Sequence, residues 1–397
     1  MNPTADRLAK ALPWTLSDKI AMKRTRPSLP YPIAFVLLAL SACANPSSPP
    51  PSTDDPATAE KAKNVILFLG DGTGLATWHA ASVRATGDSQ GLYVQQMPHI
   101  GLSDTSAASN WVADSAAGMT AIVTGHKTHN GVVSQGPEGK RGEKDGQTLK
   151  TILEYAEEHG LSTGVVTNSG VADATPAACY AHNNNRDEWG KTFAQLLEPS
   201  FGDGVDVLIG TGYERLAEGC GELGLDIPSG LEKAGYLYVQ EPTELTNLPD
   251  DAARVVAISE VAHQSDFDLP AAVRVATRIL SRNPRGFFLM VESNNHFKEA
   301  DKSIEGAIRM DQIVRETAET FAGTDTLILV TADHSYDLRM PSGKGKTKDI
   351  FDSIQIDGSH TGEQVPVFAQ GPGAQAVQGF LRNTDLFHIM MKAYGWE

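Results

Sequence analysis

The chain has 397 residues, of which 41% are hydrophobic; this is ordinary for a globular protein and long enough for one large α/β domain or two smaller ones. No apolar run reaches the ~20 residues that a membrane-spanning helix needs. The formal net charge of −16 argues against nucleic acid as a partner, because binding a phosphate backbone requires a basic surface.

The first 42 residues carry the pattern of an export signal. A basic stretch, Met22–Arg26, is followed by an apolar run, Ile33–Leu40, and then by a Leu-Ser-Ala-Cys sequence that ends at Cys43. This pattern matches a bacterial lipoprotein signal and predicts cleavage before Cys43 and lipidation of that residue. Residues 1–21 are then an overextended start, with Met22 as the initiator. We therefore expect an exported protein, anchored by its lipid at the periplasmic face of the outer membrane or at the cell surface.

Residues 43–62 are predicted to form a tether between the lipid on Cys43 and the folded domain. The stretch is rich in Pro, Ser and Thr, a composition typical of extended, disordered linkers. The folded domain is then expected over residues 63–397. Residues 1–42 hold six basic and two acidic residues, so their removal changes the net charge from −16 to −20.

Within residues 63–397, apolar runs alternate with helical patterns. The runs that predict buried strands are Val65–Leu69, Val165–Thr167, Val207–Ile209, Phe287–Val291, Leu327–Val330 and Val365–Ala369. Apolar residues at helical spacing predict helices over Gln147–His159, Pro270–Arg282, Ile304–Phe321 and Asp385–Tyr394. Strands that are apolar on both faces and alternate with helices indicate a mostly parallel sheet covered on both sides. The predicted fold class is therefore α/β, a three-layer α/β/α sandwich around a large, mostly parallel central sheet.

One stretch, residues 196–264, is less regular and rich in Gly, Pro and acidic residues. We expect it to form a cap-like insert or a subunit contact. Cys179 and Cys220 are the cysteines that follow Cys43. Export would allow a disulfide between them, whereas the Ala-rich segment around Cys179 favours buried, unpaired thiols, so both states stay open.

Acidic residues directly follow three of the predicted strands. Asp71, Glu292 and Asp333 each come at the end of an apolar run, and His334 follows Asp333. Functional residues of open α/β sheets collect at the carboxyl ends of the strands, so these side chains are expected to share one edge. A carboxylate beside an imidazole is typical of a zinc site, although a helix cap followed by an exposed histidine would give the same pair.

Ser115 stands at the start of a predicted helix, because Asp114-Ser115 precedes a helix-forming run, Ala116–Ile122. A serine at this place can be a simple helix N-cap. It can also be a nucleophile, provided that a base or a metal activates its hydroxyl. The amino end of a helix additionally favours phosphate oxygens through its free N–H groups and its dipole.

Six motifs in a fixed order connect these residues. They are Gly70-Asp71-Gly72, Asp114-Ser115-Ala116, Asp173-Ala174-Thr175-Pro176, Arg186, Asp333-His334 and His360-Thr361-Gly362. In this order they resemble the bacterial alkaline phosphatases, and the resemblance covers the chain from about Lys63 to its end. It implies an alkaline-phosphatase-like fold and the hydrolysis of small phosphate monoesters through a phosphoserine. Two copies could associate as a homodimer.

The resemblance also implies two zinc ions and one magnesium ion per chain. In that family the residues at Asp71, Ser115, Asp333, His334 and His360 belong to the zinc sites. Those at Asp173 and Thr175 hold magnesium, with Glu292 as a third oxygen ligand. The residue at Arg186 grips the phosphate, and the one at Asp114 orients that arginine by an ion pair.

The segment after Glu292 departs from the family pattern, which has a zinc Asp five residues on and a zinc His four residues later. Those positions are Phe297 and Asp301 here. A shortened loop would make His296 the imidazole ligand, with Asn294 where an Asp would stand. The alternative keeps the loop length and makes His296 and Asp301 an exchanged pair. His296 is a predicted ligand in both cases, and Lys298 is either a phosphate contact or a solvated lysine.

Two rival functions remain at this stage. One is a phosphodiesterase or sulfatase of the same superfamily. Such diesterases usually carry a Thr nucleophile and lack the arginine, and the C/S-x-P-x-R context of the sulfatases is absent. The other is a catalytically inactive, phosphate-binding protein of the cell surface, which only the altered loop, residues 294–301, favours.

Overall fold

The computed structural model describes residues 61–240, 242–261, 264–341 and 349–397. The predicted export signal, Cys43 and nearly all of the predicted tether lie outside the described residues. In the part that is described, no helix combines the length and the apolar character needed to cross a membrane.

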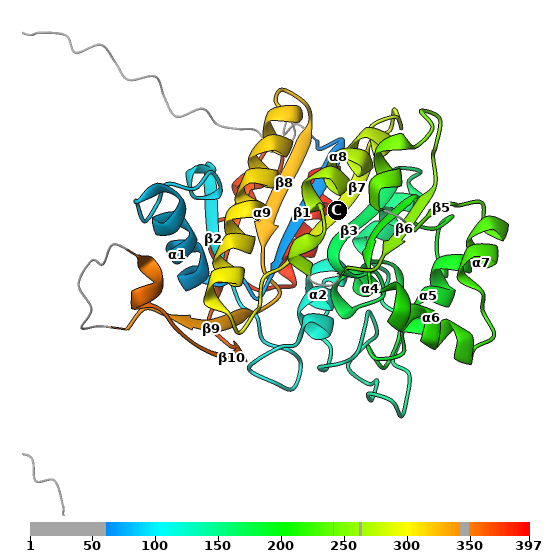
Figure 1. Cartoon of the computed structure of the whole chain (residues 1–397), viewed down its shortest axis with the longest axis horizontal. Coiled ribbons are helices and arrows are strands. Elements are labelled where there is room, and N and C mark those ends of the chain that lie inside the picture. The colour runs from blue at the N-terminus through cyan, green and yellow to red at the C-terminus, as the bar shows by residue number, and fades with distance from the viewer. Residues whose placement is uncertain (1–60, 241, 262–263, 342–348) are drawn as a thin grey trace, which may run out of the picture. The chain divides into compact units, whose positions relative to one another are not determined.

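The described strands form one ten-stranded sheet and a small two-stranded ribbon (Figure 1). The order in the sheet is β12-β2-β11-β8-β1-β7-β3-β4-β6-β5, and β11 alone runs antiparallel to its neighbours in it. The ribbon pairs β9 with β10 in antiparallel fashion. The strands are β1 Asn64–Asp71, β2 His99–Ser103, β3 Ser162–Gly170, β4 Val207–Thr211, β5 Leu237–Val239, β6 Val255–Ser259, β7 Phe287–Asn294, β8 Thr326–Thr331, β9 Ser335–Arg339, β10 Gln355–Thr361, β11 Val365–Gln370 and β12 Gly379–Leu381.

Side chains alternate across the sheet and build a separate apolar core on each face, because successive residues of a strand point to opposite sides. Along β1, Val65, Leu67 and Leu69 belong to one core, and Ile66 and Phe68 belong to the other. The first core is closed by α2 Ser115–Thr124, α3 Ile152–Glu158, α4 Ala174–Tyr180, α5 Trp189–Leu197, α6 Tyr213–Glu222, α7 Ile227–Lys233 and α10 Asp385–Tyr394. The second is closed by α1 Leu75–Thr86, α8 Leu269–Leu280 and α9 Ala300–Thr320. The predicted three-layer sandwich with a mostly parallel sheet is therefore confirmed.

The six predicted strands and four predicted helices are all present; the helix Asp385–Tyr394 has its predicted bounds, and the other elements have shifted ends. Helix α3 begins at Ile152 rather than at Gln147, because a capping box fixes its start: the side chain of Thr151 accepts from the Glu154 N–H, and the Glu154 carboxylate accepts from the Thr151 N–H. Residues 196–264, expected to be cap-like, contribute β4, β5 and β6 to the edge of the central sheet. Cys179 and Cys220 are both buried and free.

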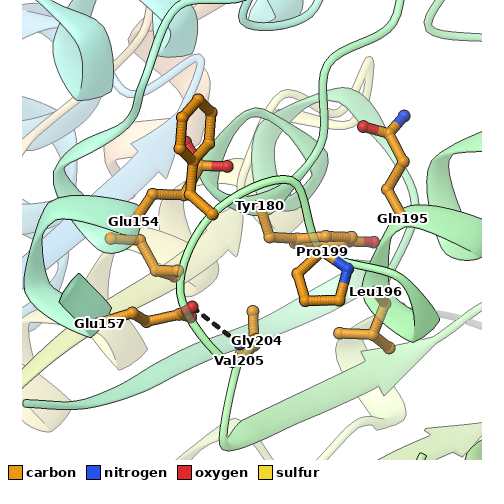
Figure 2. Close-up of a pocket in the computed structure, with 10 residues that line it drawn as sticks. Glu154, Glu157, Tyr180, Gln195, Leu196, Pro199, Gly204 and Val205 are labelled. Carbon is orange, nitrogen blue, oxygen red and sulfur yellow. Dashed lines mark hydrogen bonds between the residues drawn. The ribbon is translucent and has the colours of Figure 1, made fainter. Parts of the chain in front are cut away.

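A buried polar cluster joins α3 to the loop before β4 (Figure 2). The Glu157 carboxylate accepts hydrogen bonds from the Gly204 N–H at 2.8 Å and from the Thr163 hydroxyl at 3.0 Å. Beside it, Glu154 Oε1 lies 2.8 Å from Nε2 of His182, whose Nδ1 lies 2.8 Å from the Ser134 carbonyl. The cavity between these elements measures about 10 Å³, too small for more than one water molecule.

Candidate metal centre and nucleophile

Strand alternation gathers the predicted acidic residues on one face of the sheet. On β1, Leu67 and Leu69 face the core that contains α2, so Asp71, two residues on, emerges on the same face. The same alternation along β7, and just beyond the end of β8, places Glu292 and Asp333 on that face too. All three carboxylates are buried, and they lie at the carboxyl ends of three adjacent strands.

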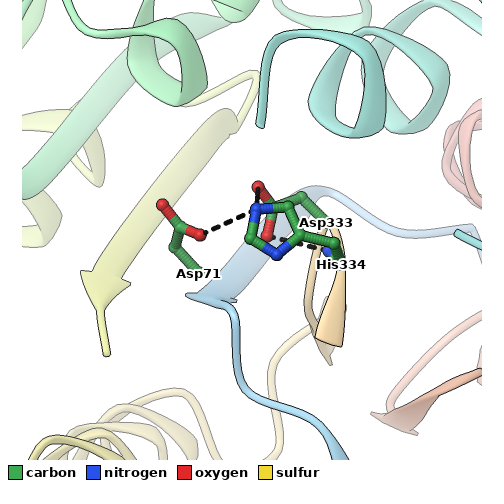
Figure 3. Close-up of side chains that lie close together, drawn as sticks. All are labelled: Asp71, Asp333 and His334. Carbon is green, nitrogen blue, oxygen red and sulfur yellow. Dashed lines mark hydrogen bonds and ion pairs between the residues drawn. The ribbon is translucent and has the colours of Figure 1, made fainter. Parts of the chain in front are cut away.

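Asp71, Asp333 and His334 form a candidate metal-binding cluster. One ligand atom from each of them lies within 4.8 Å of the others. Nε2 of His334 is 3.4 Å from Asp71 Oδ1 and 3.4 Å from Asp333 Oδ2. Figure 3 shows the imidazole turned toward both carboxylates. Carboxylate oxygens and an imidazole nitrogen at this spacing are ordinary zinc ligands.

Two further histidines adjoin this cluster. Nδ1 of His296 lies 3.1 Å from Asp71 Oδ1. His360, carried by the β9–β10 ribbon, stacks on His334 with 3.6 Å between ring centroids and 22° between planes. The centroids of His296 and His360 are 5.5 Å apart. The structure therefore brings together the predicted ligands from three distant parts of the sequence.

Several buried polar atoms of this centre have no hydrogen-bond partner. They are Asp71 Oδ1, Asp333 Oδ2, His296 Nδ1 and Asn294 Oδ1. Asp71 Oδ1 and His296 Nδ1 are close enough for an ion pair, yet they are not in hydrogen-bond geometry. Buried polar atoms normally have partners, because an unpaired one costs about 1–3 kcal/mol. Unpaired oxygen and nitrogen atoms that converge on one place fit the donor set of divalent cations.

The electrostatics of the centre also fit bound cations. Burial raises the pKa of Asp333 to about 8, and the charge of Asp71 adds to the effect. Burial and the same Asp71 charge raise the pKa of Glu292 well above its usual value. Burial alone would raise the pKa of Asp71, but the neighbouring histidines, His296 first, outweigh it and hold that pKa well below its usual value. Ionising all three buried acids at once is therefore unfavourable unless further positive charge is bound beside them.

Ser115 is held against this centre by the start of α2. Its hydroxyl lies 3.5 Å from Asp71 Oδ2 and 3.4 Å from His334 Nε2. Asp114 caps the helix by accepting from the Ala117 N–H at 3.0 Å, so Ser115 is the first helical residue rather than the cap. A Cβ on Gly118 would come within 2.6 Å of the Asp333 carbonyl, which shows how closely the helix approaches the end of β8.

Arg186 spans two carboxylates beside the nucleophile. Its guanidinium donates to Asp114 Oδ2 at 3.2 Å and to Asp173 Oδ1 at 2.9 Å. Burial alone would lower the pKa of Arg186, and the charges of Asp173 and Asp114 reverse this and raise it. The guanidinium is therefore fixed in orientation and permanently charged.

The predicted magnesium ligands lie on the same side of the sheet. Asp173 caps α4, and Thr175 is buried in its first turn. Glu292 Oε2 accepts a hydrogen bond from Thr167 Oγ1, its register partner on β3. Asp173 contributes to the raised pKa of Glu292, so the two carboxylates interact. Sequence reasoning missed Thr167, although its position at the end of a predicted strand was a usable signal.

The structure of the loop after Glu292 distinguishes between Asn294 and Asp301, the two candidates for the zinc ligand beside His296. Asn294 ends β7 directly opposite Asp71, shares its face with Glu292, and is buried. Asp301 lies in the first turn of α9 and is exposed. Lys298 is exposed as well. The structure therefore places Asn294 beside the centre and leaves Asp301 on the surface.

Comparison with known proteins finds alkaline phosphatases at the level of family, sequence and structure. The family model described as "Alkaline phosphatase" matches residues 62–358 and 353–396. The tissue-nonspecific alkaline phosphatase of Rattus norvegicus is 28% identical over 435 residues, covering 89% of this chain and 82% of its own. The alkaline phosphatase of Escherichia coli K12 is 27% identical, covering 86% of this chain and 88% of its own. A solved structure of a mutant TAB5 alkaline phosphatase with Mg bound superposes with a TM-score of 0.73 at 26% identity, covering 86% of this chain and all of that one.

Proposed function

Because the chain belongs to the alkaline phosphatase family, we propose that it hydrolyses phosphate monoesters through a covalent phosphoserine on Ser115. The observation that carries the proposal is the position of the Ser115 hydroxyl. It lies within 3.5 Å of both Asp71 and His334, at the amino end of a helix and beside the fixed guanidinium of Arg186. The nucleophile, the groups that would stabilise charge and the arginine that would bind an anion therefore lie in one site.

The chain's own residues account for binding and attack. Arg186 would hold two oxygens of the phosphate in its planar fork. The Ser115 oxygen would bond to phosphorus as the bond to the leaving alcohol breaks and that alcohol takes up a proton. Water would then cleave the seryl phosphate, which releases inorganic phosphate and restores the hydroxyl. The family's divalent ions, when bound, supply a lowered pKa for the serine and neutralise charge that develops on the leaving oxygen.

We further propose that the centre holds two zinc ions and one magnesium ion. Asp71, Asp333, His334 and Ser115 would serve one zinc ion, and His296 and His360 the other. Asp173, Thr175 and Glu292 offer the oxygen ligands that magnesium prefers. The unpartnered Asn294 Oδ1 supports it as an additional, neutral ligand beside His296.

Two measurements test the function. The first is the metal content of the purified protein together with its turnover of a chromogenic phosphate monoester and of the matching diester. The second is mass spectrometry of acid-quenched enzyme, which should find phosphate on Ser115 and none in Ser115→Ala. Ser82→Ala is the matched control, because Ser82 is also buried but bonds only within the α1 region.

Arg186→Ala should lower monoester turnover more than any diester turnover. A monoester offers more unsubstituted oxygens to the arginine than a diester does, so the fork contributes more to its binding. Phosphate on a residue other than Ser115, or an equal loss on both esters, would contradict the proposal.

We also propose export and anchoring through a lipid on Cys43. The Leu-Ser-Ala-Cys sequence after an apolar run motivates this. Among the relatives, one from Bombyx mori is described as membrane-bound, which fits a membrane location without defining the anchor. Fractionation of cells that express Cys43→Ser should find unprocessed or soluble protein, and a wild-type protein that is fully soluble without lipid would overturn the anchor.

A further inference from the structure

Trp111 is a large aromatic side chain that the fold leaves in solvent. The residue is 88% exposed, while Trp78 and Trp189 are buried. It lies in a loop, residues 107–113, that leads into the nucleophile helix α2. The reaction proposed above gives this side chain no role.

The loop that displays Trp111 is fixed at both ends. The Ala107 N–H donates to the Asn110 carbonyl at 2.9 Å, which closes the tip. The Ala108 N–H donates to the Thr128 carbonyl at 2.8 Å. On the other side, Ala107 and Ala113 pack together with Ala117 of α2. The exposed ring is therefore presented on a defined backbone rather than on a loose segment.

This backbone touches the candidate active site. The Ala113 carbonyl lies 3.3 Å from Nδ1 of His360. A Cβ built on Gly362, two residues beyond His360, would lie 3.0 Å from the Trp111 carbonyl. Trp111 and Ser115 are four positions apart in the sequence, which limits the distance between their Cα atoms to about 14 Å. Because Ser115 is buried and the leaving group departs on the opposite side of the phosphate, the organic group of the ester extends toward solvent, into which the Trp111 ring also projects.

The surroundings of Trp111 fit a single aromatic ring as its binding partner better than they fit a macromolecule. Its exposed neighbours Ala108, Ser109 and Asn110 are small or polar, so the ring does not belong to a broad apolar patch. Contact surfaces for proteins usually extend over a few hundred Å² of contiguous apolar area. A single exposed indole instead matches one aromatic ring, which it can stack against.

We propose that Trp111 is a specificity residue that stacks on the leaving group, so that the enzyme prefers monoesters of aromatic alcohols and nucleosides to aliphatic ones. This inference rests on the monoesterase function proposed above. Stacking of one ring on another favours binding by roughly 3- to 10-fold. The preference should appear mainly in KM, because the indole touches the organic group and not the phosphate.

The test compares phenyl phosphate and adenosine 5′-monophosphate with glycerol 2-phosphate. Trp111→Ala should lower the ratio of kcat/KM for the aromatic esters to that for the aliphatic ester by roughly 3- to 10-fold, and Trp111→Phe should retain most of it. Phe380→Ala is the matched control, because Phe380 is also an exposed aromatic residue, at 78%, but lies on the edge strand β12. That variant should keep the wild-type ratio.

A binding measurement separates this inference from the catalytic proposal. In Ser115→Ala, which should not turn over, adenosine 5′-monophosphate should quench tryptophan fluorescence, and adding Trp111→Phe should remove that quenching. If the wild type cleaves no monoester, the proposed function fails while the quenching result still stands on its own. If the wild type cleaves both ester classes and Trp111→Ala leaves their ratio unchanged, the stacking role is wrong. A change in oligomeric state by size-exclusion chromatography, with an unchanged ratio, would instead assign Trp111 to a contact between chains.

Discussion

Two buried polar regions of this molecule contain carboxylates and histidine, but they differ in whether their atoms have partners. In the α3 cluster, Glu154 and Glu157 each accept two contacts from groups of the chain itself, one of which, from Gly204 to Glu157, is visible in Figure 2. In the centre at the strand ends, Asp71 and Asp333 each keep an oxygen that has no hydrogen-bond partner and lies only within ion-pair distance of a histidine. Burial is nearly complete in both regions, so burial does not distinguish them.

The difference shows which region is complete without a ligand. A buried ionic group that is fully hydrogen-bonded within the chain stabilises the fold, and removing one partner leaves the other uncompensated. A buried group that lacks partners costs free energy unless something outside the chain completes it. The α3 cluster is therefore structural, and the strand-end centre is a binding site.

Asp333→Asn should give the largest effect. It removes a proposed metal ligand, so we expect monoester turnover to fall by about 10²-fold or more, with less bound metal. In metal-free protein above about pH 8 the same change should raise the melting temperature, because burial and the charge of Asp71 disfavour the ionised Asp333 carboxylate, which asparagine removes. The measurements are turnover, metal content and melting with and without a chelator. If the variant instead loses stability equally with and without chelator, Asp333 has a structural role like that of the α3 cluster and is not a metal ligand.

Glu154→Gln is the matched change in the α3 cluster. It leaves His182 without its carboxylate, and both side chains are only 4% exposed, so stability should fall by about 3 kcal/mol. Burial alone would lower the pKa of His182, and Glu154 reverses this and raises it. The loss of stability should be the same with and without chelator, and metal content should not change. A change in metal content would contradict the assignment of the α3 cluster to a purely structural role.

Asn294→Asp tests whether the strand-end centre can be strengthened. A carboxylate in place of the amide adds one negative charge next to His296 and should tighten metal binding, on the order of tenfold, because ligand charge tunes cation affinity. Competition with a chelator measures this without relying on turnover. Asp301→Asn serves as the control, since Asp301 is exposed and should not alter affinity. If Asp301→Asn weakens metal binding and Asn294→Asp has no effect, Asp301 is the ligand.

Most of the fold could be predicted from the sequence because its central strands are buried on both faces. Val65–Leu69 and Phe287–Val291 are continuous apolar runs for that reason. The short strands β5 and β12 hold three residues each and form only against their neighbours, so local sequence does not reveal them. The sheet strands within residues 196–264 depend on the same long-range pairing.

The candidate site also contains residues that could be predicted from the sequence and residues that could not. Asp71, Glu292 and Asp333 could be expected together because each follows an apolar run near the carboxyl end of a strand of one sheet. The stacking of His360 on His334 could not be predicted from strand patterns alone, since it depends on the β9–β10 ribbon folding back over the centre. The choice between Asn294 and Asp301 depends on where α9 begins, which the irregular loop does not signal.

Glu157→Gln should give the smallest effect near pH 5 and tests whether the α3 cluster, though complete, is sensitive to pH. Burial raises the pKa of Glu157 to about 8 despite its two hydrogen bonds, and the nearby Asp203 and Asp206 add to the effect. An unfolded Glu ionises near pH 4.3, so between about pH 4.3 and 8 the folded state holds the extra proton and stability falls as pH rises. Glutamine can keep both contacts, because its oxygen accepts from Gly204 and its amide donates to the Thr163 hydroxyl. The variant should therefore resemble wild type near pH 5 and exceed it at pH 9 by up to about 4 kcal/mol. Thermal melting at the two pH values measures this, and an equal difference at both would show that the carboxyl does not titrate in this window.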